Sequence, residues 1–120
     1  MRRPSVIPLV LLLVACSTPP VYLDDLEASD LASVDAVIER LSCNSYITTF
    51  HLGEGVNNES EALEVARAEG DREMRVLIER AELRGAHVWV LTTETGQVIG
   101  ALDDRGGISI CDLDVKGIDQ

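Results

Sequence analysis

The segment from residue 87 to residue 113 constrains the fold more than any other part of the chain, because short apolar runs alternate there with glycine-bearing turns. The runs are rich in valine, isoleucine and leucine, and their apolar positions follow the period of two that is typical of strands. Gly96 and the pair Gly106–Gly107 interrupt them in connections short enough for hairpins. Three consecutive antiparallel strands are predicted, at residues 87–92, 97–102 and 108–113.

A helical period precedes these strands. Apolar or small residues recur at steps of three or four between residues 60 and 84, which predicts one long amphipathic helix. Asn58, followed three residues later by Glu61, resembles a capping box at its start, and Gly85 lies where a left-handed residue commonly ends a helix. The expected core face of this helix consists of Leu63, Ala66, Gly70, Met74, Leu77 and Ala81.

Two shorter elements are expected before this helix. Residues 44–52 contain β-branched and aromatic residues in succession, which predicts a strand. Residues 31–41 fit a helical spacing and also partly alternate as in a strand; we favour a short helix capped by Ser29 or Asp30. The predicted fold is a small single α+β domain, with one long helix packed on a mainly antiparallel sheet in the order β-α-β-β-β.

The N-terminus has the pattern of a bacterial lipoprotein signal. Two arginines precede an apolar stretch shorter than the roughly 20 residues that span a bilayer, and residues 13–16 (Leu-Val-Ala-Cys) form a lipobox. We expect cleavage before Cys16 and lipidation of that residue, which would anchor the chain to a membrane. The alternative is an ordinary secretory signal with an incidental cysteine. Because Ser17 and not aspartate follows Cys16, the expected location is the outer membrane, facing the periplasm.

These expectations divide the chain into four parts. They are a signal peptide (1–15), a lipidated cysteine with an acidic tether (16–30), a small α+β domain (31–115) and a tail (116–120). The formal net charge is −11; removing the signal peptide takes away two of the ten basic residues and none of the 21 acidic ones, which gives −13. Such an acidic chain is not expected to bind nucleic acid or to adhere directly to anionic lipid.

Once Cys16 is lipidated, Cys43 and Cys111 remain as a pair. Two cysteines in an oxidising compartment predict one disulfide, which closes a loop of roughly 70 residues and stabilises by roughly 4 kcal/mol in the chain-entropy model. A redox or metal pair is the alternative, but no Cys-x-x-Cys spacing occurs. A zinc site would need both cysteines to converge with His51 and His87, so we expect no bound metal and no cofactor.

No catalytic constellation is evident. The sequence contains no G-x-S-x-G, H-E-x-x-H or P-loop motif, and we expect no enzymatic activity. On an alternating strand His87 shares a face with Trp89, and these two residues are the candidate interaction site. Trp89 is the one tryptophan available as a recognition anchor, although packing on the sheet is the simpler interpretation.

These motifs together resemble small periplasmic lipoproteins of the uncharacterised YjeI type and, more distantly, the Rcs envelope-stress sensor lipoprotein. The resemblance lies in the lipobox, in Cys43 at the first core strand, in Gly85-Ala86 before a valine-rich strand, and in the segment 107–111 that ends in a cysteine. Apart from the lipobox it covers roughly residues 34–113. The resemblance implies a fold and a location in the cell envelope, but it does not imply an enzymatic reaction.

The expected function is that of a non-enzymatic, lipid-anchored envelope protein whose domain contacts an envelope protein partner. The anchor, the tether, the single small domain and the lack of a catalytic motif all favour this interpretation. The first alternative is an envelope-stress sensor or regulator. The second is a small-ligand-binding protein or enzyme with a pocket near His87 and Trp89.

Overall fold

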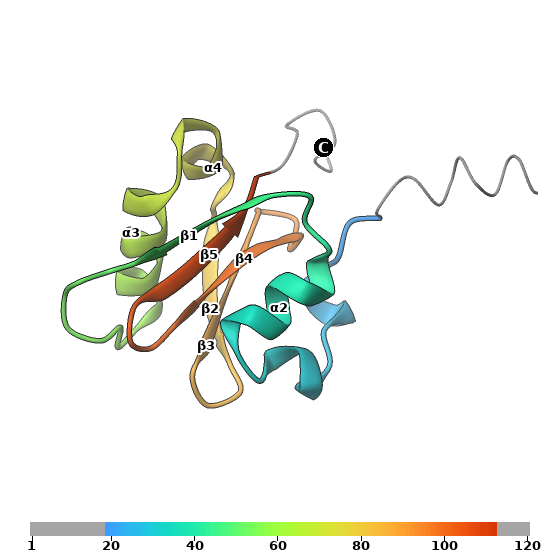
Figure 1. Ribbon diagram of the computed structural model, residues 1–120, viewed down its shortest axis with the longest axis horizontal. Coiled ribbons are helices and arrows are strands. Elements are labelled where there is room, and N and C mark those ends of the chain that lie inside the picture. The colour runs from blue at the N-terminus through green and yellow to red at the C-terminus, as the bar shows by residue number, and fades with distance from the viewer. Residues whose placement is uncertain (1–18, 113–120) are drawn as a thin grey trace, which may run out of the picture.

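A five-stranded antiparallel sheet forms the centre of the computed structural model, which describes residues 19–112 (Figure 1). Its strands are β1 (Tyr46–Phe50), β2 (Arg80–Arg84), β3 (Val88–Thr92), β4 (Val98–Asp103) and β5 (Gly107–Cys111). Their order is β1-β5-β4-β3-β2, so that β1 and β2 lie at the two edges. Consecutive strands from β2 to β5 pair with each other, which confirms the predicted meander and the α+β class.

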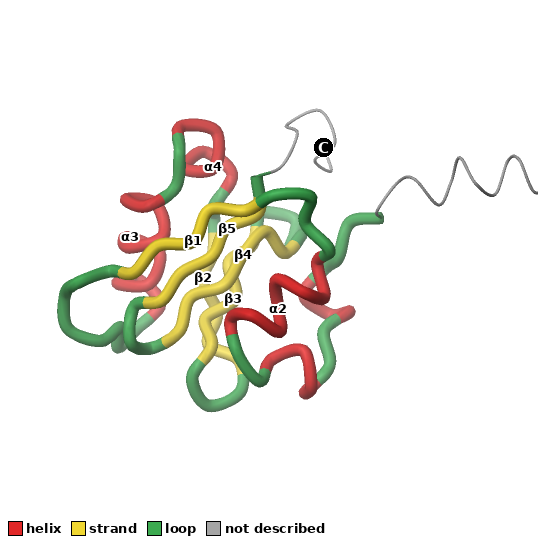
Figure 2. The backbone as a smooth tube through the Cα atoms, in the orientation of Figure 1, coloured by secondary structure: helices red, strands yellow, loops and turns green. Residues whose placement is uncertain are grey.

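Helices cover both faces of this sheet, as Figure 2 shows. They are α2 (Val34–Leu41), α3 (Glu59–Glu69) and α4 (Arg72–Leu77), with the short 3-10 helices η2 (Leu23–Asp25) and η3 (Ala28–Leu31). The ambiguous segment 31–41 is mainly helical, and its cap is Ser33, whose hydroxyl accepts a hydrogen bond from the N–H of Ala36 (3.0 Å). Within residues 19–112, none of the helices has the length and apolar composition needed to cross a membrane.

Each face of the sheet has its own apolar core, because the central strands are covered on both sides. In β3, Trp89 and Leu91 pack with α3 and α4 in what we call the α3-side core, whereas Val88 and Val90 pack with α2 in the α2-side core. A register shift in β4 leaves Ile99 as an extra residue opposite β3, and this bulge lets Ile99 join the α3-side core. Burial on both faces explains the nearly continuous apolar runs of these strands.

The prediction of one long helix over residues 60–84 is wrong. α3 ends at Gly70, whose backbone is extended (φ −70°, ψ 152°), and a new helix begins where the carboxylate of Asp71 accepts a hydrogen bond from the N–H of Met74 (3.0 Å). β2 follows and pairs antiparallel with β3. The β2 sequence Arg-Ala-Glu-Leu-Arg favours a helix locally, but pairing with β3 buries Ala81, and tertiary packing overrides the propensity.

The element order is accordingly helix, strand, two helices and four strands, in place of the predicted β-α-β-β-β. Gly85 does not end a helix; its left-handed backbone (φ 63°) turns the chain between β2 and β3. Asn58 does cap a helix, since its side-chain carbonyl accepts a hydrogen bond from the N–H of Glu61 (2.8 Å) at the start of α3.

The segment expected to be a tether is folded onto the domain from Val21 onwards. Val21 is buried, and its carbonyl accepts a hydrogen bond from the N–H of Val98 (2.8 Å). The N–H of Leu23 donates to the carbonyl of Gly96 (2.9 Å), and Leu23 packs against the α2-side core. The folded domain therefore begins near residue 21 and not at residue 31. The signal peptide, Cys16 and the tail at residues 116–120 lie outside the described residues.

Candidate functional site

The two residues predicted to form an interaction site lie in different environments. Trp89 is 5% exposed in the α3-side core, and its indole Nε1 has no hydrogen-bond partner among the described residues. His87 lies in the exposed turn just before β3, and its Nδ1 is 2.7 Å from Oδ2 of Asp104. The structure thus brings His87 and Asp104 together, whereas packing against the helices removes Trp89 from the surface.

The other histidine also has a local structural role. His51 follows β1, and its backbone N–H donates to the carbonyl of Gly106 (2.8 Å). In the part of the chain that the structure describes, no three or more His, Cys, Asp and Glu side chains are placed to hold a metal ion. Neither histidine lines any of the three hollows described below.

Cys43 and Cys111 lie at disulfide distance, with their Cα atoms 5.6 Å apart and their sulfur atoms joined. Cys43 lies between α2 and β1, whereas Cys111 ends β5, is buried in the α2-side core and pairs opposite Tyr46. The bridge joins residues 68 positions apart in the sequence. It therefore ties the start of β1 to the end of the neighbouring strand β5.

The backbone of β1 is open on its outer side. Ser45 and His51, which flank the strand, each make a backbone hydrogen bond to the β5 side (2.9 and 2.8 Å). Because hydrogen-bonded positions alternate along an antiparallel ladder, the odd-numbered residues of β1 face β5 and the even-numbered ones face outwards. No strand among residues 19–112 pairs with this outer side. The outward N–H and C=O groups are those of Tyr46, Thr48 and Phe50.

The side chains along this edge are uncharged and largely apolar. Tyr46 and Phe50 are 53% and 56% exposed, and Leu52, just beyond the strand, is 93% exposed. The β1 sequence Tyr-Ile-Thr-Thr-Phe contains neither a charged residue nor a proline. Natural edge strands usually carry such residues, or are covered, to prevent pairing with another chain. β1 therefore has the features of an edge that can accept a further strand.

Two hollows lie beside this edge, between α2 and the β1–β5 pair. The larger, about 430 Å³, is lined by Asp35, Ile38, Glu39, Ser42, Cys43 and Tyr46. The smaller, about 190 Å³, includes Asp35, Thr48 and Asp103 in its lining. The two hollows share Asp35, and we call them together the α2–β1 groove. Among the described residues, three carboxylates (Asp35, Glu39 and Asp103) but no Lys or Arg line this groove.

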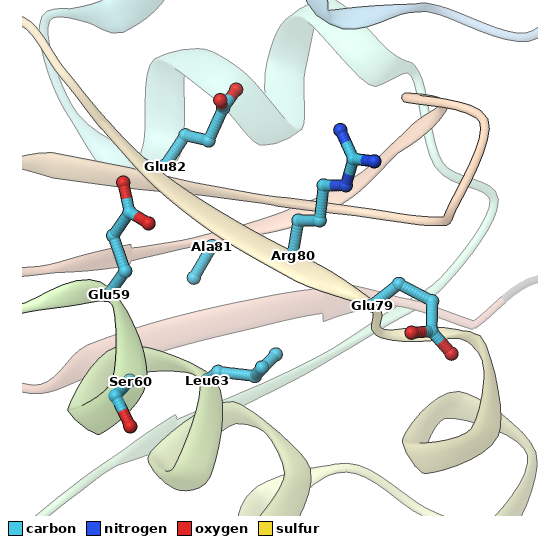
Figure 3. Close-up of a pocket in the computed structure, with 7 residues that line it drawn as sticks. All are labelled: Glu59, Ser60, Leu63, Glu79, Arg80, Ala81 and Glu82. Atoms are coloured by element: carbon cyan, nitrogen blue, oxygen red, sulfur yellow. The ribbon is translucent and has the colours of Figure 1, made fainter.

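A hollow of about 550 Å³ lies near the opposite edge of the sheet, between α3 and β2 (Figure 3). Its lining consists of Glu59, Ser60, Leu63, Glu79, Arg80, Ala81 and Glu82. Two of its carboxylates have basic partners, since Glu79 lies 3.7 Å from Arg67 and Glu82 lies 3.1 Å from Arg84. The β2 edge thus carries both signs of charge, largely compensated.

No family model, curated protein or solved structure matches this chain. The resemblance to YjeI-type lipoproteins accordingly stays a prediction from the sequence motifs.

The sequence predicts the strand at residues 44–52 but does not show that it lies at an edge. That position follows from pairing with β5, whose residues are about sixty positions away, as in the hydroxyl–hydroxyl hydrogen bond between Thr48 and Ser109 (3.0 Å, separation 61). Two signals were present in the sequence: a charge-free strand in an otherwise acidic chain, and two aromatic residues four positions apart on one face of that strand.

Proposed function

We propose that this chain is a lipid-anchored protein of the bacterial cell envelope whose domain binds a protein partner by strand addition at β1. One observation carries the proposal: the outward N–H and C=O groups of β1 lie beside exposed aromatic side chains with no charge to block pairing. In strand addition the backbone supplies affinity, and pockets for alternate side chains supply specificity. This role is non-enzymatic, because it requires no catalytic group.

The sequence supports the location of this activity. The lipobox and Ser17 favour a lipid on Cys16 and the periplasmic face of the outer membrane. Because Val21 already packs on the domain, only residues 17–20 separate that lipid from the fold. Four extended residues span at most about 14 Å. The β1 edge would therefore act close to the membrane surface, on a protein partner and not on nucleic acid.

Site-specific photo-crosslinking in cells tests the contact. A crosslinking amino acid at Tyr46 should give an adduct of defined mass, and the same amino acid at Glu64, exposed on α3, should not. Adding Thr48→Pro should remove the Tyr46 adduct, because proline deletes an outward N–H without deleting a backbone hydrogen bond to β5. No adduct at Tyr46, or the same adduct at both positions, would contradict the proposal.

The anchor is tested separately. Metabolic labelling with an alkyne fatty acid should mark the wild-type chain and leave Cys16→Ala unmarked, because the lipid is attached to that thiol. Cys43→Ala serves as the matched control and should be labelled like the wild type. Equal labelling of the Cys16→Ala variant would show that Cys16 does not carry the lipid. It would not contradict the proposed contact at β1.

A further inference from the structure

We infer that the outer side of β1 accepts an extended cationic segment, with Lys or Arg at alternate positions, from the partner protein. This inference rests on the proposed function and specifies the chemistry of the segment that binds. The hydrogen-bonding groups of β1 alone would accept any extended chain, so the partner must be selected by what surrounds them.

The position of the groove determines which side chains of an added strand would be selected. A strand paired with β1 would lie about 4.8 Å from it, with successive side chains on opposite faces of the sheet. The face on which α2 lies is the one that carries Tyr46, Thr48 and Phe50. Tyr46 pairs with Cys111, which is buried in the α2-side core, and successive even-numbered residues of a strand point to the same face. Every second side chain of the added strand would therefore lie beside these residues, next to the α2–β1 groove.

The charges of this groove favour basic side chains. Asp35 and Glu39 are exposed on α2, and neither forms an ion pair with any described residue. Asp103 uses Oδ1 to accept hydrogen bonds from the N–H groups of Arg105 and Gly107 (2.9 and 2.8 Å), which leaves Oδ2 as an acceptor. The exposed rings of Tyr46 and Phe50 add faces that attract ammonium and guanidinium groups.

The same charges oppose a second copy of this chain as the occupant. Antiparallel pairing of two β1 strands around Thr48 would give a symmetric dimer and would place Tyr46 opposite Phe50 of the other copy. It would also bring two acidic grooves together in a chain whose formal net charge is −11. Because like charges repel, and no Lys or Arg among the described residues lines the groove, its charge favours a basic partner over self-association.

Binding of a synthetic peptide to the full-length chain in non-ionic detergent tests the inference. The probe is an eight-residue peptide of alternating Lys and Val. A Glu–Val peptide of equal length serves as the control of opposite charge. The Lys–Val peptide should bind, with an affinity that falls as salt is added, and the Glu–Val peptide should bind at least tenfold more weakly. Fluorescence anisotropy of the labelled peptides gives both dissociation constants.

Matched variants locate the site. Asp35→Asn with Glu39→Gln should weaken Lys–Val binding by about fivefold to thirtyfold, since each exposed charge pair contributes up to about 1 kcal/mol. Glu64→Gln with Glu73→Gln changes the net charge equally on the other face of the sheet and should leave binding within about twofold of the wild type. Phe50→Lys places a cation on the edge without burying it and should abolish Lys–Val binding.

The outcomes separate this inference from the proposed function. Equal binding of both peptides would overturn the inference that the segment is cationic. So would equal weakening of Lys–Val binding by the two double variants. A Tyr46 crosslink that persists in cells would then still support strand addition. Concentration-dependent self-association that Phe50→Lys prevents would instead identify a second copy as the occupant and would also overturn the inference.

Discussion

The two edge strands of this sheet differ in how they are protected. β2 carries Arg80, Glu82 and Arg84, and the last two form an ion pair at 3.1 Å. β1 carries no charge, and its two aromatic side chains are more than half exposed. Charged side chains on an edge discourage pairing with another chain. The contrast supports the proposal that the open edge at β1 is a binding feature, because the same sheet shows the usual protection at β2.

The two edges also differ in how they are held in place. A three-residue turn at Gly85 connects β2 directly to its neighbour β3, so this pairing is local. β1 pairs with β5, which lies about sixty residues later, and closing a long loop costs more conformational entropy than closing a hairpin. The Cys43–Cys111 bridge lies at the start of β1 and offsets this cost. The edge that is proposed to bind a partner is therefore the one that has the covalent link.

Of the changes that test this comparison, removing the disulfide should have the largest effect on the free energy of unfolding. Cys43→Ala with Cys111→Ala should lower the free energy of unfolding by roughly 4 kcal/mol, because the unfolded chain regains its loop entropy. Urea unfolding measures the loss, and the wild-type chain under reducing conditions should match the variant. A loss below about 1 kcal/mol would mean that the bridge does not hold β1 against β5.

A smaller effect is expected from the hydroxyl pair that joins β1 to β5. Ser109 is 2% exposed, and its hydroxyl lies 3.0 Å from that of Thr48. Thr48→Val should cost about 1 kcal/mol by leaving the buried Ser109 hydroxyl without its partner, and adding Ser109→Ala should recover part of that loss. A double-mutant cycle with purely additive costs would show that this bond does not couple the strands.

The smallest effect on stability is expected from removing the charges of β2. Arg80→Thr, Glu82→Thr and Arg84→Thr together should change the free energy of unfolding by no more than about 0.5 kcal/mol, because the ion pair between Glu82 and Arg84 is partly exposed to solvent. The triple variant should nevertheless self-associate, since Leu83 is 47% exposed on an edge that is then uncharged. Sedimentation velocity compares it with Glu64→Thr on α3; a strictly monomeric triple variant would show that charge does not protect β2.

The sequence predicts the parts of this fold that depend on local signals. The hairpins from β3 to β5 follow from strand-period apolar runs between glycine turns, and the cap at Asn58 follows from its spacing to Glu61. β2 was missed because its residues are good helix formers and only pairing with β3 makes them a strand. The edge position of β1 and the groove beside α2 likewise depend on distant partners that no local pattern reveals.

Amide hydrogen exchange along β1 tests whether the outer side of this strand is the edge that binds the partner. In the free protein, the outward N–H groups of Tyr46, Thr48 and Phe50 should exchange much faster than those of Ile47 and Thr49, which face β5. Saturating Lys–Val peptide should slow the three outward amides and leave the β2 amides unchanged. The same exchange rates at β1 with and without peptide, or protection gained at β2, would contradict the account.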